Sequence, residues 1–183
     1  MNVADFRRIV IFGNNGSGKS YFARKLAAIT GLPLIHLDRE FWRPGWEMPT
    51  QAEWRQKNLE FIAGESWIID GMCSHGGTMA LRYAAADLVI YLDVNRWVCL
   101  MGVITRSKRR PDWPEHITRE KSAGDFLRFC AGVLKHRNKR GIMELHEAHP
   151  EVMFYVIKGR RGMHRQIRQW REQTSHDETD SIH

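Results

Sequence analysis

The sequence predicts a three-layer α/β fold in which helices cover both faces of a five-stranded parallel sheet. Five short apolar runs alternate with helical patterns, the order expected when each strand is followed by a right-handed helical crossover. The runs are almost continuously apolar, as expected of strands that are covered on both faces. A chain of 183 residues suits a single domain.

Each predicted strand is a short apolar run that ends in a turn or at a polar residue. The first runs into a glycine-rich loop, and the second and third end at Asp38 and Asp70. Open α/β sheets bind ligands at the carboxyl ends of their strands, so both carboxylates lie where a site is expected. The predicted strands are residues 8–12, 33–37, 66–69, 87–92 and 152–157.

Helical patterns separate the strands. The first begins at Lys19 and stops before Gly31, with Pro33 just beyond, which is a normal helix exit. Thr50 and Glu53 have the spacing of a capping box and predict the start of another helix. The predicted helices are residues 19–29, 50–62, 96–105, 123–147 and 163–172. Residues 1–172 are predicted to form one domain, and the polar residues 173–183 a disordered tail.

Residues 13–20 satisfy the phosphate-loop (Walker A) pattern G-x-x-x-x-G-K-[ST]. Its glycines let backbone N–H groups turn toward phosphate oxygens, where a side chain would collide. Lys19 is expected to reach the β- and γ-phosphates and Ser20 to ligate Mg²⁺, while the following helix directs its positive end toward the anion. The predicted nucleotide-binding residues here are Gly13, Asn14, Asn15, Gly16, Ser17, Gly18, Lys19, Ser20 and Tyr21.

The charge and composition limit the classes of binding partner and the cellular location that we expect. The formal net charge is +7, from 28 Lys and Arg against 21 Asp and Glu, which favours nucleotides, phosphorylated metabolites or nucleic acid. No apolar run approaches the roughly 18 residues that predict a membrane span. The three cysteines form no Cys-x-x-Cys pair, and the N-terminus does not read as a secretory signal. We therefore expect a cytoplasmic protein that does not bind membranes.

Four stretches resemble the nucleoside/nucleotide-kinase superfamily, which includes adenylate and shikimate kinases, and within it especially the FlaR-like DNA topology modulation proteins. The most specific is His-Leu-Asp followed by Trp-x-Pro-Gly-Trp, and the likeness spans about residues 8–160. It implies an adenylate-kinase-like fold, ATP and Mg²⁺ as cofactors, an acceptor-binding flap at about residues 39–65 and a lid at about 106–122. The four stretches are residues 13–20, 36–46, 67–71 and 89–97.

The chain departs from this family pattern at three points. Residues 72–75 read Met-Cys-Ser-His where relatives have Asn-Tyr-Ser-Arg, and a two-residue expansion follows around Gly76 and Gly77. Gly102 stands about nine residues after Asp93, where the resemblance implies an arginine that stacks on adenine. The base contact and the preference for ATP over other nucleoside triphosphates are therefore left open.

Two carboxylates are candidates for the chemistry. Asp38 could accept the proton of an acceptor hydroxyl or hold Mg²⁺ through water, and the alternative is a helix-capping residue. Asp70 could order the waters of Mg²⁺ next to Ser20, and the alternative is a turn residue before Gly71. We also expect Asp70 and Gly71 to border the acceptor.

Other candidates come from the flap, the lid and the loop after the last strand. Arg43 could form bidentate bonds to an anionic acceptor and Trp46 could stack on it, although Trp42 and Trp46 could equally pack the flap. Arg106 and Arg110 could neutralise the transferred phosphoryl group, with a solvated basic loop as the alternative. The resemblance further implies that Arg82 reaches an acceptor phosphate and that the loop at Gly159 passes the adenine.

Three functions remain in competition. The leading hypothesis is an ATP-dependent kinase that phosphorylates a small acceptor, such as a nucleoside or a nucleotide. The second is an ATP-binding regulator associated with DNA, favoured by the net charge and the basic run 106–110, although no helix-turn-helix or RNA-binding signature occurs. The third is a nucleotide binder with little turnover, in view of Gly102 and the altered residues 72–75.

Overall fold

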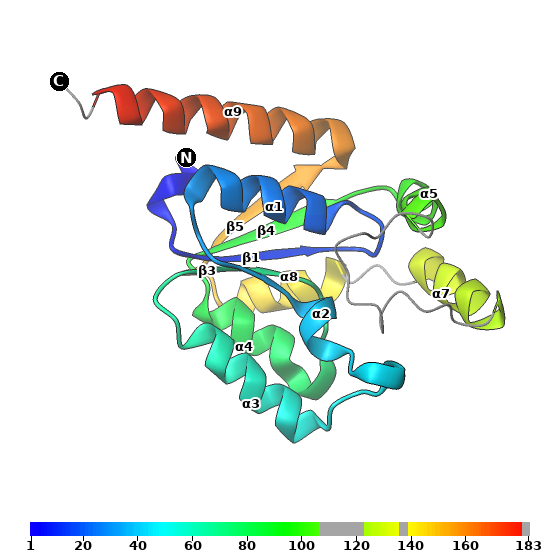
Figure 1. Ribbon diagram of the computed structural model, residues 1–183. Coiled ribbons are helices and arrows are strands. Elements are labelled where there is room, and N and C mark those ends of the chain that lie inside the picture. The colour runs from blue at the N-terminus through cyan, green and yellow to red at the C-terminus, as the bar shows by residue number, and fades with distance from the viewer. Residues whose placement is uncertain (107–122, 136–138, 181–183) are drawn as a thin grey trace.

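The computed structural model describes residues 1–106, 123–135 and 139–180 (Figure 1). Its five strands form one parallel sheet in the order β2-β3-β1-β4-β5. The predicted fold class is confirmed, and each strand lies within one residue of its predicted ends. The strands are β1 (Arg8–Gly13), β2 (Leu34–His36), β3 (Trp67–Asp70), β4 (Leu88–Asp93) and β5 (Met153–Lys158).

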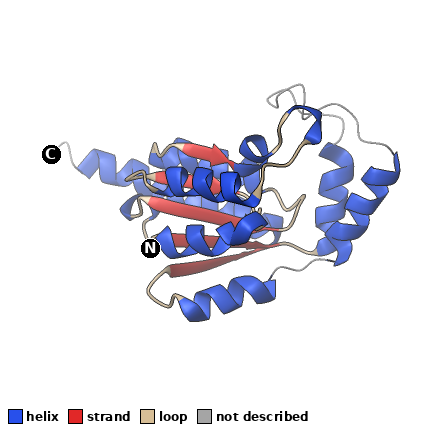
Figure 2. Cartoon of the chain, turned by 90° about the horizontal axis from the view of Figure 1, so that it is seen from below, coloured by secondary structure: helices blue, strands red, loops and turns tan. Residues whose placement is uncertain are grey.

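Helices cover both faces of the sheet, and Figure 2 shows the strands side by side between them. The α-helices described are α1 (Lys19–Thr30), α2 (Leu37–Phe41), α3 (Gln51–Ile62), α4 (Thr78–Ala85), α5 (Arg96–Arg106), α7 (Ala123–Lys135), α8 (Lys139–Ala148) and α9 (Gly159–Asp180). Short 3₁₀ helices are η1 (Val3–Asp5), η2 (Pro44–Trp46) and η3 (His75–Gly77). None of the helices in the described ranges is both long and apolar enough to cross a bilayer.

Two apolar cores lie on opposite faces of the sheet because successive strand residues point to opposite sides. In β1, Ile9 and Ile11 join the core that contains residues of α1, α5, α7 and α9. Val10 and Phe12 join the core that contains residues of α2, α3, α4 and α8. Figure 1 shows α1 and α9 over one face and α3 and α4 under the other, with α5 and α7 beyond the strand ends.

The predicted helix ends at Thr50 and Gly31 are confirmed. The Thr50 hydroxyl accepts a hydrogen bond from the Glu53 amide at 3.2 Å, and the Glu53 carboxylate accepts one from the Thr50 amide at 2.8 Å. The Thr50 amide and the Thr50 hydroxyl both donate to the Glu53 carboxylate, and with Arg43 they lower the pKa of Glu53 to about 2. At the end of α1, the Gly31 amide donates to the Ala27 carbonyl from a left-handed conformation.

Two expectations about the C-terminal half need correction. The structure gives two helices, α7 and α8, within the predicted helix 123–147, and residues 136–138 between them lie outside the described ranges. Residues 173–180 were predicted to belong to a disordered tail, but α9 continues through them to Asp180. The Thr174 and Ser175 hydroxyls donate to carbonyls four residues earlier, which satisfies these polar side chains within the helix.

Candidate functional site

The phosphate loop connects β1 to α1 at the carboxyl edge of the sheet. Its tightest point is Gly16, where φ is 77° and an added Cβ would collide with the backbone carbonyl of Cys99 in α5. No side chain fits there, so packing requires glycine at this position, although the pattern itself leaves residue 16 variable. The loop therefore rests directly on the backbone of α5, as its place in Figure 1 indicates.

Gly102 of α5 faces Gly16 of the phosphate loop. An added Cβ at Gly102 would collide with the Gly16 carbonyl and with the guanidinium of Arg160. Arg160, near the start of α9, donates to the Gly16 carbonyl at 3.0 Å and to the Val98 carbonyl at 3.4 Å. This close approach explains why the chain has glycine where the resemblance implied arginine. A larger side chain would displace the phosphate loop.

Two polar residues of the phosphate loop, Ser17 and Lys19, are buried. Lys19 is 9% exposed, and its ammonium donates to the Asn14 carbonyl at 3.0 Å. The Asn14 amide side chain donates to the Val133 carbonyl of α7 at 2.9 Å, which ties the loop to a second helix. Ser17 Oγ is buried and has no hydrogen-bond partner among the described residues. Lys19 and Ser20 open α1, as the motif requires.

Asp70 ends β3, beside the strand that carries the phosphate loop. It lies opposite Ile11 of β1 and opposite His36 of β2 in the strand register. Its side chain is 4% exposed, and Oδ2 accepts a hydrogen bond from His36 Nδ1 at 2.9 Å. Oδ1 is buried without a hydrogen-bond partner in the described part of the chain. An unpaired, buried carboxylate oxygen fits a cation or its bound water, so these residues suit the Mg²⁺ that the motif implies.

His36 was missed by sequence reasoning as a site residue. The signal was present, because His36 lies in the predicted strand 33–37, two residues before Asp38 and near the same sheet edge as Asp70. Only the register, however, places His36 opposite Asp70. The N-cap of α2 is also His36, so Asp38 lies in the first turn of the helix and does not occupy the cap position.

Asp38 lies near the chain segment that follows β3. Burial raises the pKa of the Cys73 thiol, and the negative charge of Asp38 raises it further, while Arg82 lowers it. Asp38, Cys73 and Arg82 are therefore electrostatic neighbours. Gly71 contributes to this proximity, because an added Cβ would lie 2.9 Å from the Leu37 Cβ in α2. The structure thus brings α2 against the end of β3.

Arg82 lies in a different environment from the one predicted. It is 0% exposed in α4, and its guanidinium donates to the side chains of Asn58 and Thr78 and to the Cys73 carbonyl. Burial lowers its pKa to about 10, and no ion pair compensates it among the described residues. These bonds enclose the guanidinium and join α3, α4 and residue 73. The predicted contact of Arg82 with an acceptor phosphate would require these bonds to break.

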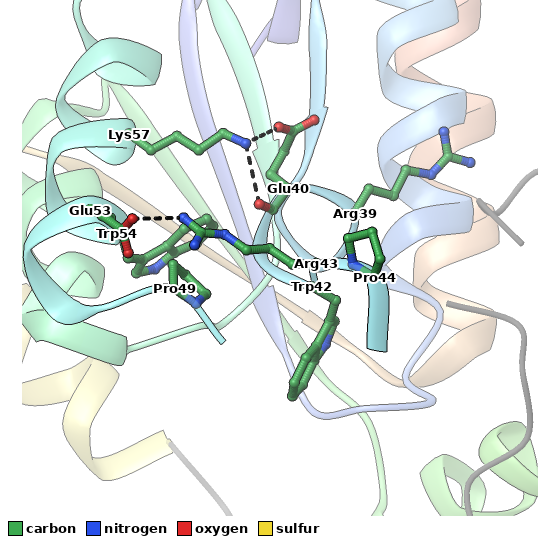
Figure 3. A pocket seen from close by; sticks show the side chains of 9 residues that line it. All are labelled: Arg39, Glu40, Trp42, Arg43, Pro44, Pro49, Glu53, Trp54 and Lys57. Carbon is green, nitrogen blue, oxygen red and sulfur yellow. Dashed lines mark hydrogen bonds and ion pairs between the residues drawn. The ribbon is translucent and has the colours of Figure 1, made fainter. Parts of the chain in front are cut away.

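The flap contains a cavity of about 260 Å³, shown in Figure 3. Ion pairs join Arg43 to Glu53 at 3.0 Å and Lys57 to Glu40 at 2.7 Å. Arg43 is 49% exposed, so solvent weakens this pair and the side chain is accessible to a ligand. The lining residues are Arg39, Glu40, Trp42, Arg43, Pro44, Pro49, Glu53, Trp54 and Lys57.

The two flap tryptophans have different outcomes. Trp42 packs edge-on against Phe41, with ring centroids 5.1 Å apart, and Phe41 in turn meets Trp54 at 4.9 Å. These contacts give Trp42 a packing role, which was the alternative prediction for it. Trp46 ends η2, near the cavity in sequence, and its predicted stacking role stays a prediction.

The lid prediction falls mostly outside the described ranges. Arg110 lies within 107–122, and Arg106 is the last residue of α5. Two basic residues at the start of α8 form ion pairs, with Lys139 2.8 Å from Asp93 and Arg140 3.0 Å from Glu144. The Lys139 pair holds the start of α8 to the carboxyl end of β4, next to the phosphate-loop strand.

Two more predicted nucleotide-binding residues lie around α9. Gly159 follows β5 with φ 67°, a left-handed conformation, and begins α9 immediately before Arg160. Tyr21 is 37% exposed and packs edge-on against His164 of α9, with ring centroids 5.5 Å apart. Both residues therefore border the junction between the phosphate loop and α9.

The chain has the fold of small P-loop kinases. A gluconokinase from Sinorhizobium meliloti 1021 matches 96% of this chain and 95% of its own, with 15% identity and a TM-score of 0.53. A shikimate kinase from Acinetobacter baumannii in complex with shikimate matches over 96% and 93%, with 17% identity and a TM-score of 0.54. A shikimate kinase from Bacteroides thetaiotaomicron matches over 93% and 99%, with 14% identity and a TM-score of 0.50. No protein-family model and no curated protein matches the chain.

Proposed function

We propose that the protein is a Mg²⁺- and ATP-dependent kinase that phosphorylates a small hydroxylated acceptor. The observation that carries this proposal is the pairing of two features at one sheet edge. One is a complete phosphate loop with its lysine buried at the start of α1. The other is Asp70 in the adjacent strand, whose Oδ1 is buried without a hydrogen-bond partner in the described ranges.

The nucleotide side of the site is assigned to the loop and its neighbours. The loop amides and Lys19 would hold the phosphates, and Lys19 would exchange the Asn14 carbonyl for phosphate oxygens. Ser20 and Asp70 would hold Mg²⁺ and its waters, and the metal would supply charge neutralisation at the transferred phosphoryl group. Tyr21 and Gly159 would border the nucleoside end.

The acceptor side is assigned to the region between α2 and the end of β3. Asp38 would orient the acceptor hydroxyl and accept its proton. Gly71, which has no side chain, would let the acceptor approach beside Asp38. Arg43 and Trp46 would contact the far end of the acceptor from the flap. Arg106 and Arg110 would approach from the lid, so catalysis would rest on positioning and electrostatic stabilisation.

The proposal also concerns the chemical class of the acceptor. The resemblance to FlaR-like proteins and adenylate kinases favours a nucleoside or a nucleotide. The matched structures include kinases named for gluconate and shikimate, both hydroxylated carboxylic acids. Acceptors of both classes carry a hydroxyl group that could lie next to Asp38, so both classes are tested in one panel of acceptors.

ADP release from Mg-ATP tests the proposal. The panel contains nucleosides, nucleoside monophosphates, gluconate and shikimate, each with and without duplex DNA. We expect one small acceptor to stimulate ADP release, and Asp38→Asn to abolish the stimulation while nucleotide affinity is retained. Asp5 of η1 is exposed, so Asp5→Asn is the matched control and should behave as wild type. Tight nucleotide binding with no turnover for any acceptor would contradict the proposal.

A DNA-associated regulator is the second candidate, and one surface favours it. Arg161, Arg165 and Arg168 are exposed along α9 at a spacing that places them on one face of the helix. Such a row fits a phosphate backbone, although it also fits a solvated helix face. Stimulation of ADP release by DNA alone, lost when these arginines are replaced by glutamine, would favour the regulator over the kinase.

A further inference from the structure

His36 has no role in the chemistry proposed so far, yet it contacts the centre of the site. It is the last residue of β2, and its side chain is 12% exposed. The parallel register places it opposite Asp70, and Nδ1 lies 2.9 Å from Asp70 Oδ2. A strand-end histidine bonded to a strand-end carboxylate is a specific arrangement that strand formation alone does not require.

The chemistry of the pair fixes which atom donates. A carboxylate only accepts hydrogen bonds, so His36 Nδ1 carries the hydrogen and Asp70 Oδ2 receives it. The bond holds one of the two Asp70 oxygens and thereby the plane of the carboxylate. The other oxygen, Oδ1, stays buried and has no hydrogen-bond partner in the ranges that the structure describes.

The unpaired Asp70 Oδ1 indicates the function of the His36–Asp70 hydrogen bond. Buried polar atoms are nearly always hydrogen-bonded, so an unpaired one at a ligand site points to a missing partner. Asp70 lies opposite Ile11 in β1, the strand that leads into the phosphate loop. Residues that bond the far oxygen of a metal-binding carboxylate commonly tune metal affinity without touching the metal.

We propose that His36 is a positioning residue that holds Asp70 Oδ1 toward the Mg²⁺ of the bound nucleotide. The inference rests on the proposed function, since it requires a nucleotide that carries Mg²⁺. His36 acts only through Asp70, so its effect appears in the Mg²⁺ dependence of nucleotide affinity. A purely structural role in the three-residue strand β2 would change stability and leave that dependence intact.

The test measures the affinity of a non-hydrolysable ATP analogue by calorimetry, with and without Mg²⁺, on the full chain. The ratio of the two dissociation constants is the readout, and it does not depend on turnover. His36→Asn keeps an N–H donor at the position of Nδ1, whereas His36→Gln places its donor at the position of Nε2. The two variants are matched in polarity and differ in where the donor lies.

We expect His36→Gln to reduce the Mg²⁺ effect by about tenfold or more and His36→Asn to retain most of it. Asp70→Asn should reduce it at least as much, and adding His36→Gln to Asp70→Asn should change it no further. Thermal unfolding without nucleotide, run on every variant, separates this effect from loss of the fold. ADP release by the wild type then tests the proposed function independently.

Three results would overturn the inference. Equal Mg²⁺ effects in the Asn and Gln variants would exclude a role for the Nδ1 donor. A further loss when His36→Gln is added to Asp70→Asn would show that His36 does not act through Asp70. If the wild type bound the nucleotide equally well with and without Mg²⁺, a role of Asp70 in holding the metal would be excluded, and nucleotide binding itself would still stand.

Discussion

The contact between Gly102 and the phosphate loop makes a sharp prediction for Gly102→Ala. The added methyl group would meet the Gly16 carbonyl, which is backbone, and the Arg160 guanidinium, which is the end of a flexible side chain. Arg160 can move aside, but the carbonyl can move only with the loop or with α5. The strain therefore falls on the loop that is proposed to hold the nucleotide phosphates.

The expected size follows from two opposing effects. Overpacking a tight contact typically costs about 1–3 kcal/mol, whereas alanine is more favourable than glycine in a helix by about 1 kcal/mol. The free protein can relieve the contact by shifting the loop, so its unfolding free energy should fall by no more than about 2 kcal/mol. Nucleotide binding must restore the native loop, so affinity should fall roughly 5- to 160-fold for about 1–3 kcal/mol of strain.

The assay compares nucleotide affinity and urea unfolding for Gly102→Ala and for a matched control, Gly141→Ala in α8. Apart from its chain neighbours and the adjacent backbone of α8, no atom of the described residues lies within 4 Å of a Cβ added at Gly141, so alanine there should stabilise the fold and leave affinity unchanged. If Gly102→Ala behaved like this control in both measurements, the packing of α5 on the loop would be refuted. Arg160→Ala should weaken affinity less than Gly102→Ala, because it removes hydrogen bonds without displacing the backbone.

The remaining predictions concern residues that stabilise α3 and its packing against α4. Thr50→Ala removes the N-cap of α3 and should lower the unfolding free energy by about 1 kcal/mol in urea titrations. Because the pKa of Glu53 is lowered to about 2, its contribution is present above its unfolded pKa near 4.5 and is lost as pH falls toward 2. The Thr50→Ala difference should therefore shrink across that window in acid unfolding, and a constant difference would exclude Glu53 as its partner. Asn58→Ala leaves a buried donor of Arg82 unpaired and should destabilise the fold by about 1–3 kcal/mol, whereas exposed Gln56→Ala should not.

The fold was predictable because its signals are local and mutually consistent. Strands buried on both faces are apolar throughout, so their positions are visible without knowledge of their neighbours. The Thr50 and Glu53 pair and the loop 13–20 are likewise defined by spacing within a few residues. The short helix α2 and the helix α4 were not predicted, because five and eight residues give too little periodicity to recognise.

The site was predictable only where one segment carries it. The phosphate loop and the strand-end carboxylates could be identified from sequence, but their neighbours depend on contacts between distant segments. Arg82 illustrates this, because the family resemblance predicted a ligand contact for it, while its bonds to Asn58 and the Cys73 carbonyl enclose it. His36 illustrates the converse, because its partner Asp70 is 34 residues away and only strand register joins them.

Gly102 shows how a departure from a family pattern can be a packing requirement. Read alone, the loss of an arginine at this position argues for a weakened base contact. In the structure, Gly102 and Gly16 are in close contact, and Arg160 bonds the Gly16 carbonyl from α9. An arginine at 102 would collide with both, so arginine at 102 is incompatible with this placement of α5. The glycine is therefore part of how this chain builds its phosphate loop, and it is not by itself an argument that nucleotide binding has been lost.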